Sequence, residues 1–191
     1  MLAFCSAQPF IIYHQNLVSV CLPIRNKKYA HKTGLFIGRF QPFHLGHLHA
    51  LKYALARCET LVIGIGSAQE SGTERNPFDA NARARMIKES MKKAGLDVSR
   101  TKFIKIPDFY DDKNWFDYIV KKVPDIEVVF SRNPWVKRIF RKEGIRIVAP
   151  PWYNRRRISG TKIRKLMKTK SGWQKLVPKP VTKFAKSAKQ K

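Results

Sequence analysis

Five short apolar segments that alternate with amphipathic stretches constrain the fold of this 191-residue chain more than any other feature. The segments carry Leu, Ile, Val and Phe on both faces, which is typical of parallel strands covered on both sides. We expect strands at 35–38, 60–66, 102–106, 126–130 and 145–148. We expect helices at 48–57, 79–93, 115–123, 134–142, 159–168 and 172–186. This order predicts an α/β fold: a Rossmann-like, doubly wound, parallel five-stranded sheet with helices on both faces.

The length suits one folded domain. We expect the α/β domain at 34–170, an N-terminal extension at 1–33, and a C-terminal helix and basic tail at 171–191. The extension lacks the basic start and the uninterrupted apolar core of a secretory signal. We therefore expect it to be poorly ordered, or to result from a start codon assigned too early.

Cysteine usage and hydropathy bear on the compartment. The three cysteines, Cys5, Cys21 and Cys58, form no metal-binding or redox spacing. Such sparse usage is typical of a reducing interior. No apolar run approaches the roughly 20 residues that a membrane span requires. We expect a cytoplasmic protein without a membrane partner.

The charge of the chain is strongly basic and unevenly distributed. Its 39 Lys and Arg against 13 Asp and Glu give a formal net charge of +26. From Arg155 to Lys191 there are fourteen basic and no acidic residues. Such a block favours phosphate-rich partners, namely nucleotides, nucleic acid or an anionic surface. Nucleic-acid binding through this C-terminal segment is possible but not expected as the main role, because a solvated basic face also explains the tail.

The loop after the first expected strand carries Arg39, His44, Gly46 and His47 just where a helix begins. In doubly wound sheets, ligands bind outside the carboxyl ends of the strands. A helix N-terminus offers unpaired N–H groups and a partial positive charge to an anion. Glycine at 46 leaves room for a phosphate or a base to approach the backbone. These residues predict a polyphosphate site.

The histidines in and after this loop allow two further roles. His44, His47 and His49 could bind a metal, but no carboxylate accompanies them, and we name no metal ligand. They could also be packing residues. We expect His49 to be structural, since it lies on another face of the helix.

Two motifs carry a family resemblance. GRFQPFHLGH (38–47) resembles the phosphate-binding motif of the HxGH nucleotidyltransferases, and ISGTKIR (158–164) resembles the partner motif of that superfamily. The first motif follows the first expected strand and the second follows the fifth, in the order that the superfamily has. Within the superfamily, the chain is most similar to the archaeal type of nicotinamide-nucleotide adenylyltransferase. The segments that carry this similarity are GIGSAQ (64–69), RNPF (75–78), RNPWVKRIF (132–140) and GWQKLVPK (172–179).

The resemblance implies an activity and its participants. That family joins nicotinamide mononucleotide to the AMP part of ATP, giving NAD and pyrophosphate by direct in-line attack. ATP implies Mg²⁺, carried mainly on phosphate oxygens and water. The resemblance also implies a homo-oligomer.

The resemblance further assigns site residues. The catalytic set would be His47, nearest the α-phosphate, with His44, Arg39, Arg75 and Arg164. ATP would also contact Gly38, Phe40, Gly46, Asn133, Ser159 and Thr161. Nicotinamide mononucleotide would contact Trp115, Ser67 and Arg75, with Trp115 stacked on the nicotinamide ring.

Some of these assignments have simpler alternatives. Trp115 could be a core residue, and Ser159 could serve only as a helix cap.

The sequence also departs from the family pattern at two positions. Arg132 stands where the family more often has Gly, so the loop on the adenine side is expected to differ. Ala82 stands where a Glu is common, which suggests that Arg83 is either exposed or available to a phosphate.

Two competing functions also remain. One is adenylyl transfer to another phosphorylated acceptor, such as FMN or pantetheine phosphate. The other is a non-catalytic RNA-binding protein, which the basic tail suggests and which leaves the two paired motifs unexplained.

Overall fold

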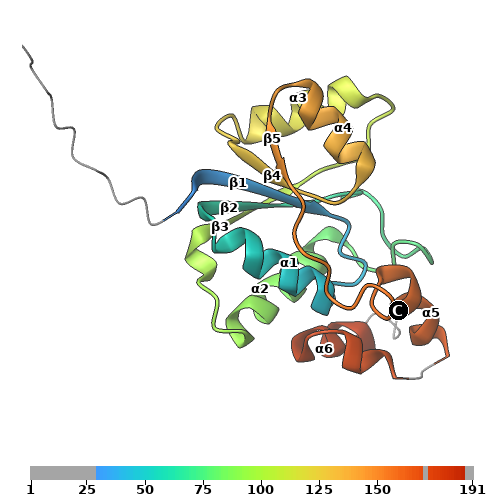
Figure 1. Ribbon diagram of the computed structural model, residues 1–191. Helices are drawn as coiled ribbons and strands as arrows, with labels where there is room; N and C mark the ends of the chain where they lie inside the picture. Colours follow the sequence, from blue (N-terminus) through green and yellow to red (C-terminus); the bar gives the residue numbers. More distant parts are fainter. Residues whose placement is uncertain (1–28, 170–171, 188–191) are drawn as a thin grey trace, which may run out of the picture.

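The computed structural model describes residues 29–169 and 172–187, and its centre is a five-stranded, fully parallel sheet (Figure 1). The strand order is β3-β2-β1-β4-β5. The strands are β1 (His31–Gly38), β2 (Cys58–Ile65), β3 (Thr101–Lys105), β4 (Val128–Phe130) and β5 (Arg146–Val148). The predicted fold class is confirmed.

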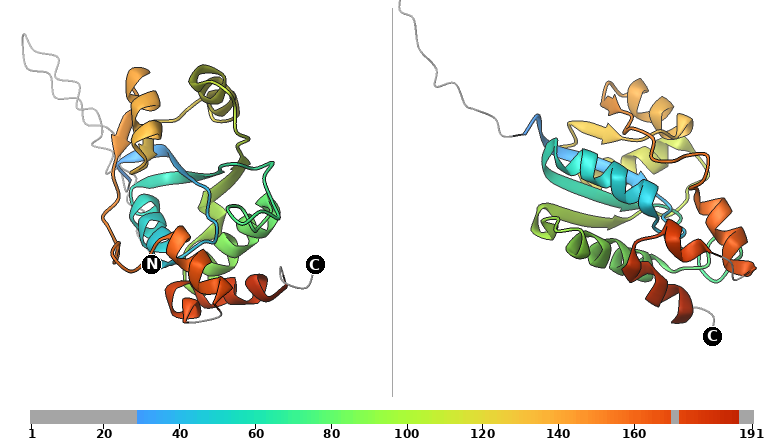
Figure 2. Two further views of the ribbon diagram at one scale, coloured as in Figure 1. Left: turned by 90° about the vertical axis from the view of Figure 1, so that its right-hand side faces the viewer. Right: turned by 60° about the horizontal axis from the view of Figure 1, so that its bottom comes forward.

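Helices cover both faces of the sheet, as Figures 1 and 2 show. On one face, α1 (Leu45–Leu55) and α2 (Ala80–Lys93) enclose a core cluster that includes Phe36 and Ile63. On the other face, α3 (Asp112–Lys122) and α4 (Pro134–Lys142) enclose a second cluster that includes Leu35 and Val62. Neighbouring residues of one strand thus point into opposite cores, which explains why the strands are apolar on both faces.

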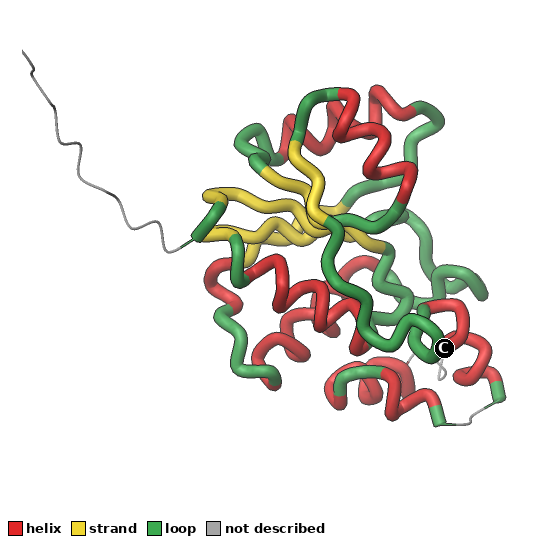
Figure 3. Tube along the Cα trace, viewed as in Figure 1, coloured by secondary structure: helices red, strands yellow, loops and turns green. Residues whose placement is uncertain are grey.

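The connections that leave β1 and β4 run to opposite faces of the sheet. β1 and β4 are neighbours, with Leu35 opposite Val129 in the register. The chain continues from β1 into α1 on one face and from β4 into α4 on the other. Such a reversal opens a crevice beyond the strand ends. The segment after β5 passes this end of the sheet on its way to α5 (Gly160–Lys168), as the loop trace in Figure 3 shows.

Several element boundaries differ from the expected ones. β1 begins at His31, earlier than expected, and α1 begins at Leu45, because His44 caps it. The prediction of a single helix at 172–186 is wrong. This segment instead forms a 3-10 helix at Trp173–Leu176, which is followed by α6 (Lys179–Ser187). Val177 between them is extended, as favoured for a residue that precedes proline.

The C-terminal segment joins the core of the domain. Trp173, Val177 and Val181 are buried in the cluster that α1 and α2 enclose. Residues 1–28, including Cys5 and Cys21, lie outside the described residues. Cys58 is buried in β2. Within the described part of the chain, no helix is long and apolar enough to cross a membrane.

Candidate active site

Two adjoining cavities open at the carboxyl edge of the sheet. The first cavity, of about 400 Å³, lies between the segments that follow β1 and β4 and the start of α5. The second cavity, of about 610 Å³, lies between the loops after β1, β2 and β3 and the start of α4. The two cavities share Ile37, Gly38, Arg39 and Asn133. Ligands in the two cavities would therefore meet at this shared wall.

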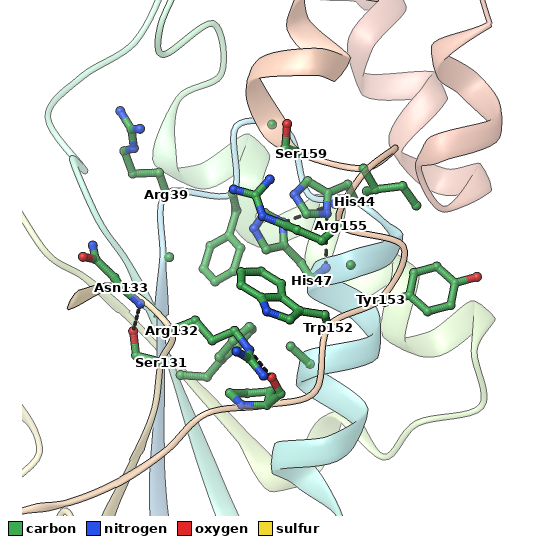
Figure 4. Close-up of a pocket in the computed structure, with 18 of the residues that line it drawn as sticks. Arg39, His44, His47, Ser131, Arg132, Asn133, Trp152, Tyr153, Arg155 and Ser159 are labelled. Carbon is green, nitrogen blue, oxygen red and sulfur yellow. Dashed lines mark hydrogen bonds between the residues drawn. The ribbon is translucent and has the colours of Figure 1, made fainter. Parts of the chain in front are cut away.

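His44 and His47 hold each other through the backbone at the start of α1. The His47 N–H donates to His44 Nδ1 at 3.2 Å, and the His44 N–H donates to His47 Nδ1 at 3.4 Å. The two imidazoles stack, with ring centroids 3.5 Å apart and planes at 14° (Figure 4). Because each Nδ1 accepts a hydrogen bond, a neutral ring carries its proton on Nε2. Both rings can therefore offer an N–H donor to a ligand.

Both histidines are neutral near pH 7. Burial, and then the positive charge of Arg155, lower the pKa of His44 to about 4. Burial and then His44 hold the pKa of His47 well below its usual value. The imidazoles thus act as neutral donors, and the positive charge of the cavity comes from arginines.

His49 lies apart from this pair. Its ring stacks on Tyr153 with centroids 5.2 Å apart. Over residues 29–169 and 172–187, no group of three His, Cys, Asp or Glu side chains could hold a metal ion. The three histidines therefore do not form a metal cluster in this structure.

Three helices present their N-termini to the first cavity. His44, Asn133 and Ser159 are the N-caps of α1, α4 and α5, and all three line this cavity. Pro134 occupies the first turn of α4, where its missing N–H costs nothing. The N-terminus of each helix carries partial positive charge. Their convergence makes the first cavity attractive to an anion with several charges.

Two glycines allow close packing around this cavity. A side-chain carbon at Gly46 would lie 3.1 Å from the His44 ring, so the imidazole occupies the space that we expected a ligand to use. A side-chain carbon at Gly160 would lie 3.1 Å from the Gln41 carbonyl oxygen. Arg164 Nη1 donates to that same oxygen at 2.8 Å. The start of α5 is thereby docked on the loop that follows β1.

Arg39, Arg75 and Arg164 repel one another across the two cavities. Desolvation, followed by Arg75, lowers the pKa of Arg39, whereas Asp108 raises it. Burial, followed by Arg39 and Arg75, lowers the pKa of Arg164. Arg39 lines both cavities, Arg75 only the second and Arg164 only the first. An anion placed among them would relieve this repulsion.

The second cavity is organised by side chains from the loops after β2 and β3. Ser67 Oγ donates to Asp108 Oδ1 at 3.1 Å, and Gln69 Nε2 donates to Asp108 Oδ2 at 3.2 Å. Asn76, 6% exposed, also lines this cavity. In the described part of the protein, Asn76 Oδ1 is buried without a hydrogen-bond partner. A buried acceptor of this kind favours a ligand that donates to it.

Trp115 serves the core and the second cavity together. Its side chain is only 4% exposed, and its ring lies 4.5 Å from Trp135 and 5.9 Å from Phe140, centroid to centroid. It nevertheless lines the second cavity. Trp135 is 38% exposed, and its Nε1 donates to Asp112 at 2.7 Å. The more accessible aromatic surface of this cavity therefore belongs to Trp135, which was not predicted from the sequence as a site residue.

The expectation for Arg83 is wrong, because this side chain is fully buried and is not directed at a cavity. Its guanidinium donates to the carbonyls of Arg39, Gly66, Ser67 and Asp79. Backbone carbonyls thus stabilise the charge of Arg83, so the absence of a glutamate at position 82 does not leave this side chain exposed or available to a phosphate.

Arg132 binds the segment that follows β5. Its Nε donates to the Pro150 carbonyl, and its guanidinium lies 4.3 Å from the centroid of Trp152. Arg155 lies 5.2 Å from the centroid of the same ring. Figure 4 shows Trp152 and both arginines at the wall of the first cavity. Neither Trp152 nor Arg155 was predicted from the sequence as a site residue.

The expected residues fall into two groups, although Gly38, Arg39 and Asn133 line both cavities. The residues expected to contact ATP all line the first cavity: Gly38, Arg39, Phe40, His44, Gly46, His47, Asn133, Ser159, Thr161 and Arg164. Those expected to contact the mononucleotide, namely Ser67, Arg75 and Trp115, all line the second. Asn76 and Asp108 were missed, although Asn76 lies inside the RNPF segment and Asp108 follows the third strand.

Comparisons with known proteins identify the family of this chain. Residues 35–166 match the model of the cytidylyltransferase-like family. A nicotinamide-nucleotide adenylyltransferase of Saccharolobus solfataricus is 47% identical over 151 residues, which cover 79% of this chain and 88% of that protein. One from Thermococcus onnurineus is 40% identical over 158 residues, covering 83% and 84% of the two chains.

A solved structure shares the fold. The bifunctional NMN adenylyltransferase/ADP ribose pyrophosphatase of Francisella tularensis superposes with a TM-score of 0.72 at 24% identity. The match covers 83% of this chain and 49% of that one, so this chain spans about half of its length. A second structure of that protein is described as a complex with AMP and a manganese ion. From its family match and its archaeal relatives, the chain belongs to the nicotinamide-nucleotide adenylyltransferases of the cytidylyltransferase-like family, and it is a nucleotidyltransferase.

Proposed function

We propose that this enzyme joins the AMP moiety of ATP to nicotinamide mononucleotide, giving NAD and pyrophosphate. The observation that carries the proposal is the pair of adjoining cavities that share Arg39. The first cavity, with three helix N-termini, suits the triphosphate. The second, with Arg75 and Trp115, suits a phosphorylated acceptor with a flat ring. The family of the close relatives supports the same reaction.

The proposed chemistry requires positioning and charge stabilisation rather than a base. The 5′-phosphate of the mononucleotide is already a nucleophile. Its oxygen forms a bond to the α-phosphorus while the bond to the leaving pyrophosphate breaks in line. The Nε2–H donors of His44 and His47 stabilise the α-phosphate, and Arg39 and Arg164 stabilise the charge on the pyrophosphate. Arg75 and Arg39 hold the attacking phosphate from the second cavity.

A divalent cation accompanies ATP in this proposal, and Mg²⁺ is the ion that we expect. Among the described residues that line the first cavity, none carries a carboxylate. The cation would therefore be held by phosphate oxygens and water, as is common for Mg²⁺. When bound, it neutralises charge that builds up on the leaving group.

Asn76 is a candidate for recognition of the acceptor. Its buried, unpaired Oδ1 can accept a hydrogen bond from a ribose hydroxyl in the second cavity. An assay with each acceptor in turn separates nicotinamide mononucleotide from FMN and pantetheine phosphate.

The test is chromatography of reactions that contain purified protein, ATP, Mg²⁺ and nicotinamide mononucleotide. We expect NAD and pyrophosphate in equal amounts. His47→Ala should lower the rate by about 10²–10³, since losing one such donor typically has this effect. His49→Ala is the matched control and should stay within about twofold, because its ring lies against Tyr153.

Two results would contradict the proposal. If folded wild-type protein forms no NAD but does form a product with FMN or pantetheine phosphate, the acceptor is wrong. If His47→Ala retains full activity, the first cavity is not where the α-phosphate reacts.

A further inference from the structure

We propose that Arg83, which touches neither cavity, is a positioning residue that fixes the wall shared by the two proposed substrate sites. The inference rests on the proposed function for its kinetic consequences. It rests on geometry alone for the structural ones.

The Arg83 guanidinium joins three segments that are distant in sequence. Nη1 donates to the carbonyl oxygens of Arg39 at 2.9 Å and Gly66 at 2.7 Å. Nη2 donates to that of Ser67 at 3.0 Å, and Nε to that of Asp79 at 3.2 Å. The loop after β1, the loop after β2 and the N-cap of α2 thus converge on one side chain. Because a peptide is planar, fixing these carbonyls fixes the peptide planes of both loops.

Both loops contain a residue in a conformation that side chains rarely adopt. Phe40 has φ of 52° and Ser67 has φ of 47°. Phe40 follows directly on the Arg39 carbonyl, and Ser67 lies between the two remaining loop carbonyls that Arg83 holds. Such conformations persist only where the surroundings impose them. The Arg83 side chain donates hydrogen bonds to the backbone at both places.

Among the residues that the structure describes, the buried charge of Arg83 has no carboxylate partner at contact distance. Arg83 is 0% exposed, and the ion pairs of the described residues do not include it. Burial lowers the pKa of Arg83, and the charges of Asp79 and Asp108, which raise it, only partly offset this effect. Carbonyl dipoles provide the contacts that stabilise the ion, and Ala82 contributes no charge. A guanidinium is suited to this task because its five N–H donors lie in a rigid plane.

The consequence for the site is the placement of Arg39 and Ser67. Arg39 must stay near Arg75 and Arg164, which repel it. Ser67 must keep its hydroxyl on Asp108 in the second cavity. By holding the backbone of both residues, Arg83 keeps the two cavities in a fixed relation, which in-line attack requires.

The test compares Arg83→Lys and Arg83→Met with the matched variants Arg85→Lys and Arg85→Met. Arg85 lies two residues further along α2 and is exposed. Lysine retains the charge but offers its donors from one nitrogen, so it cannot reach all three segments. Hydrogen exchange is measured by mass spectrometry on the folded full chain. Steady-state kinetics are measured well below the unfolding temperature.

We expect both Arg83 variants to exchange amide hydrogens at least tenfold faster at 38–42 and 66–69, with the β-sheet core unchanged. We expect kcat/KM to fall at least tenfold for ATP and for the mononucleotide alike. Arg85 variants should match wild type within about twofold in both measurements. A residue that only stabilises the fold would lower the melting temperature but leave the kinetics of the folded protein unchanged.

Unchanged exchange in the two loops of Arg83→Lys would overturn the proposal, as would wild-type kinetics in that variant. If Arg83→Met does not fold, Arg83→Lys decides. If neither folds, the guanidinium serves folding, and the positioning role is rejected. If wild-type protein forms no NAD, the proposed function fails, while the exchange measurement still judges the role of Arg83.

Discussion

The two cavities of this enzyme differ in the chemical groups that line them. The first is lined by the N-caps of three helices and by two neutral imidazoles, and none of the described residues that line it carries a carboxylate. The second is lined by loop side chains, among them Glu70 and Asp108, and by two tryptophans. The first is thus suited to a highly charged anion through fixed backbone dipoles. The second is suited to a smaller charge beside a flat, polar ring.

The largest expected effect tests whether Trp115 belongs to the core or to the second cavity. Trp115→Ala should lower the free energy of unfolding by about 3–5 kcal/mol, as is typical for a large aromatic core residue. Trp135→Ala removes a partly exposed ring and one hydrogen bond, so it should cost about 1 kcal/mol. Chemical denaturation measures both.

The KM values of the Trp135 variant also test whether the two cavities bind different substrates. Trp135→Ala should raise the KM for the mononucleotide and leave the KM for ATP unchanged. Equal destabilisation by the two substitutions would show that Trp115 is not held in the core as its 4% exposure indicates.

The next effect concerns the shared wall. Arg39→Ala should lower kcat by about 10²–10³, since one charged donor to the reacting phosphates is lost. It should also raise both KM values, because Arg39 lines both cavities. Steady-state kinetics with each substrate varied in turn provides the measurement.

The matched variants are Arg75→Ala and Arg164→Ala. The first should raise mainly the KM for the mononucleotide, and the second mainly the KM for ATP. If either variant raised both KM values equally, the division into two cavities would be wrong for the phosphate contacts.

A third prediction concerns the pH dependence of stability at the first cavity. The pKa of His44 is about 4 in the folded protein, against about 6.5 in an unfolded chain. Between these values the unfolded chain binds more protons, so the free energy of unfolding falls as the pH falls through this window. The loss from His44 is about 3 kcal/mol and is complete below about pH 4. His47, whose pKa is also lowered, acts in the same direction.

His44→Asn is the variant that isolates this effect. Asparagine can still accept the capping hydrogen bond from the backbone, but it cannot take up a proton. Denaturation at several pH values should give a shallower slope between pH 6.5 and 4 for His44→Asn than for wild type. Parallel curves would mean that His44 is not held neutral by the fold.

The contrast between the cavities also explains what could be predicted from the sequence. The strands were identifiable because the central ones, β1, β2 and β4, carry continuous runs of buried apolar residues. The first cavity was identifiable because a helix N-terminus with its caps is a local, contiguous pattern. His44 and His47 are only three residues apart, and Ser159 caps the helix that it begins. Helix-cap patterns of this kind can be recognised in the sequence before the fold is known.

The remaining features depend on contacts between distant residues. Asp108 and Ser67 are 41 residues apart, and Arg83 reaches Arg39 across 44 residues. Nothing near Arg83 in the sequence indicates that backbone carbonyls would surround it. The break at Val177 was detectable from Pro178, but the apolar period of the segment favoured one continuous helix.

The smallest expected effect separates capping from ligand binding at Ser159. The Lys162 N–H donates to Ser159 Oγ at 3.3 Å, so Ser159→Ala should lower the free energy of unfolding by about 1 kcal/mol. Ser159→Asp should restore that stability, because aspartate caps helices as well as serine does. It should nevertheless raise the KM for ATP above that of Ser159→Ala, since it introduces a negative charge into a cavity that we assign to the triphosphate. Thermal melts and ATP titrations of the three proteins measure the two effects independently. If Ser159→Asp restored both stability and ATP affinity, Ser159 would act as a cap alone, and the N-terminus of α5 would not face a phosphate.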